Sequence, residues 1–361
     1  MGHSQYPILR IDRKALENNG RRMAELCRDR GISACAVVKG VNSLPQCCDI
    51  LSRCGFTALA SSRLEQLRRI KELGARLPTM LIRIPMLSEV SDLVSFADSS
   101  LVSEMKTLRR INEEASAQGK THRVILMADL GDLREGWFRR QDLLEAALTV
   151  EEGLSNVELY GIGTNLSCYG SIVPTVENLG ELAEAAEEIE TRIGRRLEVI
   201  SGGATTAVPL MMTGDMPERI NHLRLGECLF TRPLSWEQDV EGMDRRAFTI
   251  RAEIIELNEK PTFPIGQRGV AAFGKARTYE DRGIRRRAIL ALGNQDLGDA
   301  KNALIPRDGQ TFVLGASGDH LIVDIEDCSH LYELGGTMDF GLTYQGLLYA
   351  SMSPWVNKLY I

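Results

Sequence analysis

The sequence has none of the cysteine spacings, long apolar runs or basic excess that mark several common protein classes. Its eight cysteines include no C-x-x-C pair, and Cys47 and Cys48 are adjacent, so neither a zinc site nor a disulfide framework is indicated. No apolar run approaches transmembrane length, and residues 1–12 are too polar for a signal peptide. The net charge of −6 argues against nucleic acid or an anionic membrane as partner. We therefore expect a cytoplasmic enzyme or binding protein without a metal.

Internal repeats, low-complexity linkers and a G-x-G-x-x-G motif after the first apolar strand are also missing. With 361 residues, 43% hydrophobic and 25% charged, the chain is an ordinary globular protein that is too long for one usual core. Two domains, or a large barrel with an extra domain, are expected.

The first two thirds of the chain alternate between apolar strand-like runs and charged segments of helical periodicity. The helical segments include 63–75, 104–119 and 176–194. Eight βα units in succession predict a (β/α)₈ barrel rather than a doubly wound open sheet. The predicted strands are 33–39, 57–61, 79–85, 99–103, 123–130, 157–163, 197–203 and 221–226.

After about residue 236 the sequence becomes rich in β-branched and aromatic residues separated by glycine, proline and asparagine, which predicts an all-β domain. The predicted organisation is an N-terminal strand in 1–12 that pairs with the C-terminal domain, a barrel over 13–235 and a β-domain over 236–361. The strand-like stretches of that domain are 247–259, 269–279, 286–294, 310–327 and 338–350.

Polar side chains gather at the predicted carboxyl ends of the barrel strands, where βα barrels carry their chemistry. Arg83 could simply pair with a carboxylate and Asn165 could cap a turn, but their coincidence with other polar groups indicates a site. In chain order these groups are Lys39, Arg83, Asp129, Arg134, Asn165, the stretch 201–206 and Arg224.

Lys39 ends the apolar stretch "ACAVVKGVNS" and allows two interpretations. An ammonium in apolar surroundings is costly, so the lysine could extend into solvent where the strand ends. Alternatively it is kept there for amine chemistry, with a lowered pKa or as a Schiff base.

The stretch "EVISGGATT" delivers two glycines and two hydroxyls from a strand into a predicted helix. Such a turn can close backbone N–H groups on a phosphate, with Thr205 and Thr206 contacting the anion or capping the helix. An ordinary glycine-containing βα turn is the alternative, and the absence of a P-loop lysine argues against a nucleotide triphosphate.

A lysine after the first strand and a phosphate cradle after the seventh suggest an aldehyde that carries a phosphate, pyridoxal 5′-phosphate. The chain resembles the fold-type III pyridoxal-phosphate enzymes of the alanine racemase group over nearly its whole length, and most closely their ornithine-racemase-like branch. The motifs that carry the resemblance are "AVVKGVNS", "LIRIPMLSEV", "ILMADLGDLREG", "GIGTNLSCYG", "EVISGGATT" and "HLRLGECLF".

The resemblance implies a role for each matched residue. Lys39 would bind the cofactor covalently and act as one catalytic base, and Arg134 would lie near the phenolic oxygen. Arg224 would face the pyridine nitrogen, and Tyr344 in "TYQGLL" would contact the phosphate. The other phosphate-holding residues would be Ser201, Gly202, Gly203, Thr205, Thr206 and Gly226.

An arginine at the ring nitrogen has a chemical consequence. A guanidinium cannot accept a proton, so the ring nitrogen would stay unprotonated and the ring would be a weaker electron sink. That favours removal and return of a proton at Cα over transamination, and racemisation needs little more than two bases on opposite faces.

The chain departs from the family pattern at the second base. Asn294 in "LGNQDLG" stands where the family has a catalytic tyrosine donated by the partner subunit, and an amide cannot serve as a base. Asn165 stands where the family has the histidine that orients that tyrosine. The replacement candidates are Cys168, Tyr169, Asp319 and His320, of which we favour Cys168 and Asp319.

The sequence therefore predicts an amino-acid racemase, with ornithine or another basic amino acid as the free substrate and Asp319 or Asp296 as a carboxylate for its side chain. The resemblance implies a homodimer in which the partner's β-domain completes each site. Two alternatives stay open. A non-catalytic pyridoxal-phosphate-binding protein would resemble the barrel alone, and an amino-acid decarboxylase of the same fold type would carry a cysteine that the "GASGD" stretch lacks.

Overall fold

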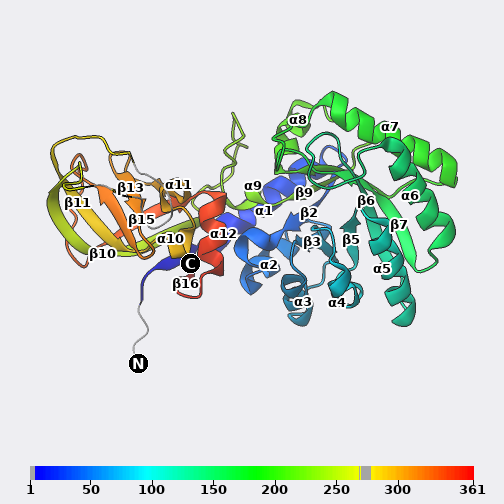
Figure 1. The fold of residues 1–361 in the computed structure, drawn as a ribbon, viewed down its shortest axis with the longest axis horizontal. Helices are drawn as coiled ribbons and strands as arrows, with labels where there is room; N and C mark the ends of the chain where they lie inside the picture. The colour runs from blue at the N-terminus through cyan, green and yellow to red at the C-terminus, as the bar shows by residue number, and fades with distance from the viewer. Residues whose placement is uncertain (1–4, 268, 270–277) are drawn as a thin grey trace. The chain divides into compact units, whose positions relative to one another are not determined.

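The computed structural model describes residues 5–267, 269 and 278–361 and divides the chain into two compact units (Figure 1). The barrel unit comprises Leu16–Leu229 and Pro233–Met243. The β-unit comprises Met1–Ala15, Phe230–Arg232 and Asp244–Ile361. The sequence had placed these divisions after residues 12 and 235.

Eight parallel strands close into a barrel, which confirms the predicted fold class. The last strand pairs with the first, with Ser33 opposite His222 and Ala36 opposite Leu225. The strands are β2 (Ser33–Val37), β3 (Ala58–Ser61), β4 (Thr79–Leu81), β5 (Ser99–Val102), β6 (His122–Ala128), β7 (Val157–Thr164), β8 (Val199–Ala204) and β9 (His222–Leu225).

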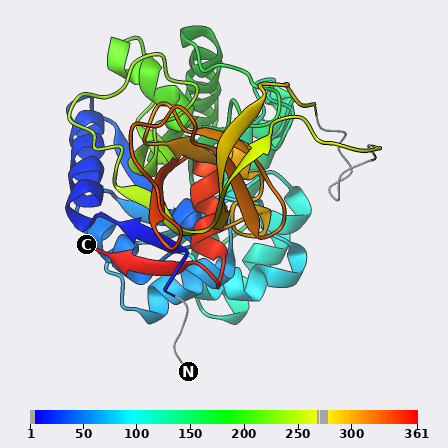
Figure 2. The ribbon, with the colours of Figure 1, turned by 90° about the vertical axis from the view of Figure 1, so that its left-hand side faces the viewer.

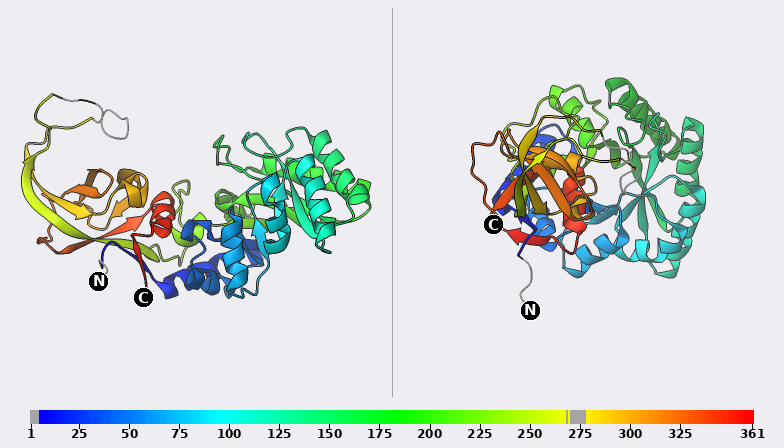
Figure 3. Two further views of the ribbon diagram at one scale, coloured as in Figure 1. Left: turned by 60° about the horizontal axis from the view of Figure 1, so that its bottom comes forward. Right: turned by 60° about the vertical axis from the view of Figure 1, so that its left-hand side comes forward.

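Helices connect the barrel strands and lie outside them (Figures 1 and 3). In α5, Leu108, Ile111 and Ala115 are buried at helical spacing, which is the amphipathic pattern expected of an outer helix. The helical segments are α1 (Arg13–Arg28), η1 (Val38–Val41), α2 (Pro45–Ser52), α3 (Leu64–Glu72), η2 (Leu87–Glu89), α4 (Val90–Phe96), α5 (Met105–Ala117), α6 (Arg140–Gly153), α7 (Val176–Ile193), η3 (Thr205–Ala207), α8 (Val208–Thr213) and α9 (Glu227–Phe230).

Alternate residues of the barrel strands point inward and fill the interior. They form one buried cluster, so the barrel is a packed core and ligands can reach only its ends. The cluster consists of Cys35, Val37, Ala58, Ala60, Met80, Leu101, Ile125, Met127 and Val199.

Most predicted barrel strands are longer than the observed ones by one or two residues, and two of them, the first and the third, differ in ways that bear on the rim. The first ends at Val37, and Lys39 lies in the 3-10 turn that follows. The third ends at Leu81, because Arg83 turns to bond the Ile84 carbonyl and Pro85 has no N–H for a further ladder bond. Both differences extend the loops at the carboxyl ends of the strands.

The long strand β10 organises the β-unit. It pairs with β1 and β15 along Phe248–Glu253 and with β11 from Ile254 onward. The β11 pairing contains a bulge between Ile254 and Glu256, and β10 curves along its length (Figure 3). The strands are β1 (Ile8–Ile11), β10 (Phe248–Pro261), β11 (Ile284–Ala291), β12 (Leu304–Pro306), β13 (Phe312–Ala316), β14 (His320–Asp324), β15 (Thr337–Leu342) and β16 (Asn357–Tyr360).

Only the first part of the expected strand-like stretch 338–350 forms a strand, and the rest is helical. Strand β15 ends at Leu342, and Thr343 then caps helix α12 (Tyr344–Met352) by accepting the Gly346 N–H at 3.4 Å (Figure 2, red helix). Helix α12 packs against the short helices α10 (Asn294–Leu297) and α11 (Ala300–Ala303), so the β-unit is not purely strand. The stretch 269–279 falls largely outside the described residues.

Along the described residues, no helix has both the length and the apolarity needed to cross a bilayer.

The barrel buries an ionisable ring at the start of β6. His122 is almost fully enclosed, its Nε2 lies 3.0 Å from Ser100 Oγ, and burial lowers its pKa to about 4.

We expect acid to destabilise the barrel unit through His122. Since the unfolded chain binds this proton at the ordinary pKa near 6.5, the free energy of unfolding falls as the pH drops from there toward 4, by up to about 1.4 kcal/mol per pH unit. His122→Gln keeps a partner for Ser100 and should make that slope shallower, while the buried His222, whose pKa is also lowered, keeps its own contribution. Urea denaturation midpoints across this pH range measure it, and parallel slopes in parent and variant would contradict the assignment.

Candidate active site

Lys39 lies just beyond β2 and its side chain is partly buried. Among the described residues no hydrogen bond or ion pair holds its ammonium. Burial lowers the pKa of Lys39, and Arg134 and Arg224 lower it further. Cys168 and Glu135 act in the opposite direction, so the loops that follow β6 and β7 lie within electrostatic range of the lysine.

Arg224 on β9 is a buried cation, with 3% of its surface exposed. Its guanidinium donates to Ser201 Oγ at 2.5 Å and to the Thr164 carbonyl at 2.6 Å, and it has no carboxylate partner in the described structure. The Ser201 hydroxyl, which accepts from Arg224, is also hydrogen-bonded to Nδ1 of His222, 2.9 Å away. Burial and the nearby arginine lower the pKa of His222 to about 3, which keeps its ring neutral.

The glycine-rich end of β8 approaches its neighbours closely. A Cβ on Gly202 would lie 2.5 Å from Ile220 Cγ2, and Gly203 has a φ of +116°, which side chains rarely adopt. The indole of Trp236 donates to the Thr205 carbonyl at 3.2 Å and anchors the turn from outside. The close approach at Gly202 and the positive φ at Gly203 therefore both require glycine in this turn.

The two threonines of this turn have different surroundings. Thr205 is 5% exposed, its hydroxyl accepts the N–H groups of Gly226 and Cys228 at 3.4 Å each, and it donates to the Cys228 thiol. Thr206 is partly exposed and reaches only the Leu166 carbonyl, at 3.5 Å. The Thr205 hydroxyl is therefore enclosed and engaged, whereas Thr206 is partly exposed and more weakly bonded.

The loop after β6 brings Arg134 to the same rim. Arg134 forms a two-pronged ion pair with Glu135, one of whose contacts is 2.5 Å. The neighbouring Asp132 is buried and accepts backbone N–H groups from the loop after β7. Glu135 and Asp132 could not be singled out from the sequence, because nothing in their spacing distinguishes them from surface carboxylates.

Strand β7 ends in two polar groups that find no partner among the described residues. The buried atoms Thr164 Oγ1 and Asn165 Nδ2 form no hydrogen bond there, which is costly unless a bound group or water satisfies them. Beyond them, Cys168 is the one cysteine of eight that is exposed. The exposed Tyr169 follows it.

Arg83 and Asp129 have structural partners instead. Arg83 forms a bidentate ion pair with Glu89, at 2.7 and 2.8 Å. The Asp129 carboxylate accepts the N–H groups of Gly131 and Leu133, at 3.0 Å each, and shapes its own loop.

The remaining candidates belong to the β-unit. Asn294 bonds the Ala316 carbonyl and the Ala300 N–H, so its amide joins α10 to its surroundings. Asp296 is 3% exposed and accepts Ser353 Oγ at 2.9 Å, which removes it as a partner for a substrate ammonium. Asp319 and His320 are exposed and bonded to each other at 2.7 Å, and Tyr344 begins α12.

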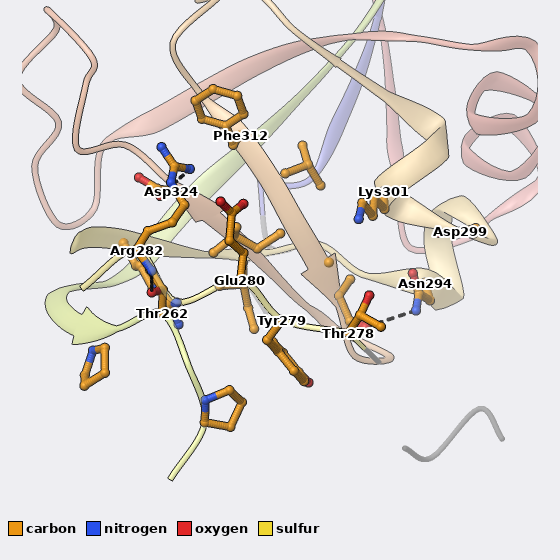
Figure 4. A pocket seen from close by; sticks show the side chains of 18 of the residues that line it. Thr262, Thr278, Tyr279, Glu280, Arg282, Asn294, Asp299, Lys301, Phe312 and Asp324 are labelled. Carbon is orange, nitrogen blue, oxygen red and sulfur yellow. Dashed lines mark hydrogen bonds and ion pairs between the residues drawn. The ribbon is translucent and has the colours of Figure 1, made fainter. Parts of the chain in front are cut away.

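Asn294 also lines a cavity of about 1110 Å³ within the β-unit (Figure 4). Lys301, Glu280 and Arg282 surround the same space, with Phe312 on one wall. The position that the sequence analysis compared with a catalytic tyrosine therefore borders open space.

A βα barrel with a lysine, two arginines and a glycine-rich turn at one rim defines the class, and the comparisons agree: residues 11–233 match the family described as alanine racemase, N-terminal domain. The chain belongs to this family. It is 40% identical to an ornithine racemase of Acetoanaerobium sticklandii over 98% of this chain and 99% of that one. It is 38% identical to a lysine racemase of Thermotoga maritima over 98% of each.

Solved structures show the same fold at low identity. An alanine racemase from a D-cycloserine-producing Streptomyces lavendulae matches with a TM-score of 0.75 and 18% identity, over 100% of this chain and 98% of that one. A D-threonine aldolase from Filomicrobium marinum matches with a TM-score of 0.73 and 15% identity, over 96% and 88%. These matches establish the architecture of both units.

The different surroundings of the two threonines predict different costs of substitution. Thr205→Val removes the acceptor of two buried N–H groups and should lower the free energy of unfolding by about 1–3 kcal/mol. Thr206→Val should change it by less than about 0.5 kcal/mol. Urea titrations of the two isosteric variants provide the comparison, and equal losses would show that the Thr205 hydroxyl is not structural.

Proposed function

We propose that the protein is a pyridoxal-phosphate-dependent amino-acid racemase that interconverts L- and D-enantiomers, with ornithine or another basic amino acid as substrate. The full-length similarity to an ornithine racemase and a lysine racemase supports both the reaction and the substrate class. Because those matches cover the β-unit as well as the barrel, they favour an enzyme over a binding protein built on the barrel alone.

The observation that carries the proposal is a pair of cations without carboxylate partners at one rim. Among the described residues, the partly buried Lys39 ammonium has no ion-pair partner and the buried Arg224 bonds neutral oxygens, although buried charges normally require compensation. Beside them lie the unsatisfied groups of Thr164 and Asn165. This donor set fits an anionic ligand that also accepts hydrogen bonds, as pyridoxal phosphate does.

Each rim group has a role toward that cofactor. Lys39 would hold it covalently, Arg224 would face its ring nitrogen, and Arg134 and Asn165 would contact its polar edge. When bound, the cofactor supplies an electron-withdrawing ring that acidifies the Cα–H of the attached amino acid. The phosphate would be held by the turn and the partner β-unit through Ser201, Gly202, Gly203, Thr205, Thr206, Gly226 and Tyr344. In that set Ser201 and Thr205 would contribute chiefly their backbone, since their hydroxyls are engaged.

Proton transfer at Cα needs a base on each face, and Lys39 suits one of them. Its lowered pKa leaves a larger neutral fraction near neutral pH than an ordinary lysine has, so its amine can accept a proton. Arg224, being a donor only, would leave the ring nitrogen of the bound cofactor unprotonated, which would favour return of the proton to Cα.

We assign the second base first to Cys168, whose exposed thiol acts electrostatically on both Lys39 and Arg134. Asp319 is the second assignment, since it is the exposed carboxylate of the β-unit stretch that the family resemblance points to, and it would also suit a basic side chain. We further propose a homodimer in which the β-unit of one copy completes the rim of the other.

Lys39 is expected to carry the cofactor. Borohydride reduction of the holoprotein should fix a pyridoxyl group on the peptide containing Lys39, and Lys39→Ala should lose both the label and Cα deuterium exchange. Lys358→Met is the matched control, because burial also lowers the pKa of Lys358, in the β-unit. A label on another lysine, or no bound cofactor after reconstitution, would overturn the proposal.

Removal of the second base should affect the enantiomers unequally. In D₂O, Cys168→Ser should abolish deuterium incorporation at Cα from one enantiomer of ornithine or lysine, while Lys39 still exchanges the other. Cys328→Ser, a partly buried thiol bonded to Thr311, is the control and should match the parent. The same asymmetry in Asp319→Asn alone would move the base to the β-unit.

Two further outcomes bear on this assignment. If Cys168→Ser, Tyr169→Phe, Asp319→Asn and His320→Gln all exchange both enantiomers at the parent rate, the second base is none of these residues. If the parent exchanges neither enantiomer of ornithine, lysine, alanine or serine, the protein binds the cofactor without turnover.

A further inference from the structure

The loop that carries Cys168 has a backbone conformation that needs support from surrounding groups. It follows β7 without regular secondary structure, and Ser167 and Ser171 have φ values of 64° and 56°. Such left-handed conformations at residues other than glycine cost free energy and persist only when surrounding groups impose them. A bond from the Ser167 hydroxyl to the Ile172 carbonyl, at 2.7 Å, closes the loop on itself.

One carboxylate supplies the rest of the restraint. Asp132 Oδ2 accepts the N–H groups of Cys168 at 3.3 Å and Tyr169 at 3.0 Å. Its Oδ1 accepts those of Gly170 at 3.1 Å and Ile172 at 3.4 Å. Asp132 is 1% exposed, so these four groups replace the water that a carboxylate would otherwise bind.

The contact is close enough to fix the spacing of the two loops. A Cβ on Gly170 would lie 2.9 Å from the Asp132 carbonyl oxygen, so the glycine permits the approach. The loop that carries Asp132 is itself anchored to β6, because the Trp137 N–H donates to the Met127 carbonyl at 2.8 Å. Burial alone would raise the pKa of Asp132, but the backbone N–H groups outweigh it and lower that pKa, so the restraint stays charged near neutral pH.

We propose that Asp132 is a positioning residue that fixes the Cys168 loop relative to Lys39 and so determines proton transfer on one face of the substrate. The proposal rests on the racemase function proposed above. Asp132 has no open surface toward the rim and acts through the four backbone groups. Loss of its charge should therefore release the loop and impair transfer at the Cys168 face, while transfer by Lys39 continues.

Asp132→Asn tests the proposal, because its NH₂ group would face N–H donors that need an acceptor. Asp98→Asn is the matched control. Asp98 also accepts a backbone N–H, that of Thr79 at 2.7 Å, but it lies before β5, at the amino end of the barrel strands. If Asp132→Asn fails to fold, Gly170→Ala presses on the same contact from the other side and leaves the carboxylate in place.

The first measurement is amide hydrogen exchange of the substrate-free protein. In Asp132→Asn the peptide spanning 166–173 should exchange at least about tenfold faster than in the parent, since each 1.4 kcal/mol of lost restraint gives one factor of ten. In Asp98→Asn that peptide should be unchanged. Unchanged exchange in Asp132→Asn would overturn the proposal whether or not the protein is a racemase.

The second measurement is Cα deuterium incorporation from each enantiomer separately. The proposal expects at least about a tenfold drop from one enantiomer relative to the other, in Asp132→Asn or Gly170→Ala. Equal losses from both enantiomers would identify a merely structural residue and overturn it. An absence of exchange in the parent would refute the racemase function, while the amide exchange would still report on the restraint itself.

Discussion

The hydrogen bonding between β2 and β9 is the constraint on which the site depends. These strands come from opposite ends of the barrel sequence, and their register places Cys35 beside Arg224 and Ala36 beside Leu225. Lys39 follows the first of these strands and Arg224 lies on the last. Closure of the barrel therefore brings together two cations that no local sequence pattern connects.

Bringing these two cations together without a carboxylate partner among the described residues is electrostatically costly. Other arginines of the protein form ion pairs with carboxylates, as Arg251 does with Asp339 and Arg285 with Asp324. At the rim the acceptors are a serine hydroxyl and a backbone carbonyl, so Arg224 is held in place without being neutralised. If an anionic group binds here, as proposed above, it meets a cation that is already in place, which reduces the reorganisation that binding requires.

The sequence allowed the barrel to be predicted because each strand is a short apolar run and each outer helix shows a helical period, and both signals are local. It placed Lys39, Arg134 and Arg224 at one rim for the same reason. The role of Asp132 could not be predicted, because four N–H groups from another loop reach it only in the folded chain. Thr205 and Thr206 are adjacent and identical in type, so only tertiary contacts separate their surroundings. Helix α12 was missed because its residues also suit a strand, and the cap at Thr343 is a single weak signal.

The pairing of β1 determines which of the two units can form first while the chain is being synthesised. This strand pairs antiparallel with β10 and parallel with β16, while the barrel sequence lies between β1 and both partners. A ribosome releases β1 early, yet its two neighbours emerge only after the barrel has been made, and β16 comes last of all the strands. The barrel can thus close during translation before the two neighbours of β1 have been made, whereas the β-unit needs residues from both sides of the barrel sequence. Until β10 has been made, the Ile8–Ile11 segment has neither of its neighbours and leaves the backbone N–H and C=O groups of a strand unpaired.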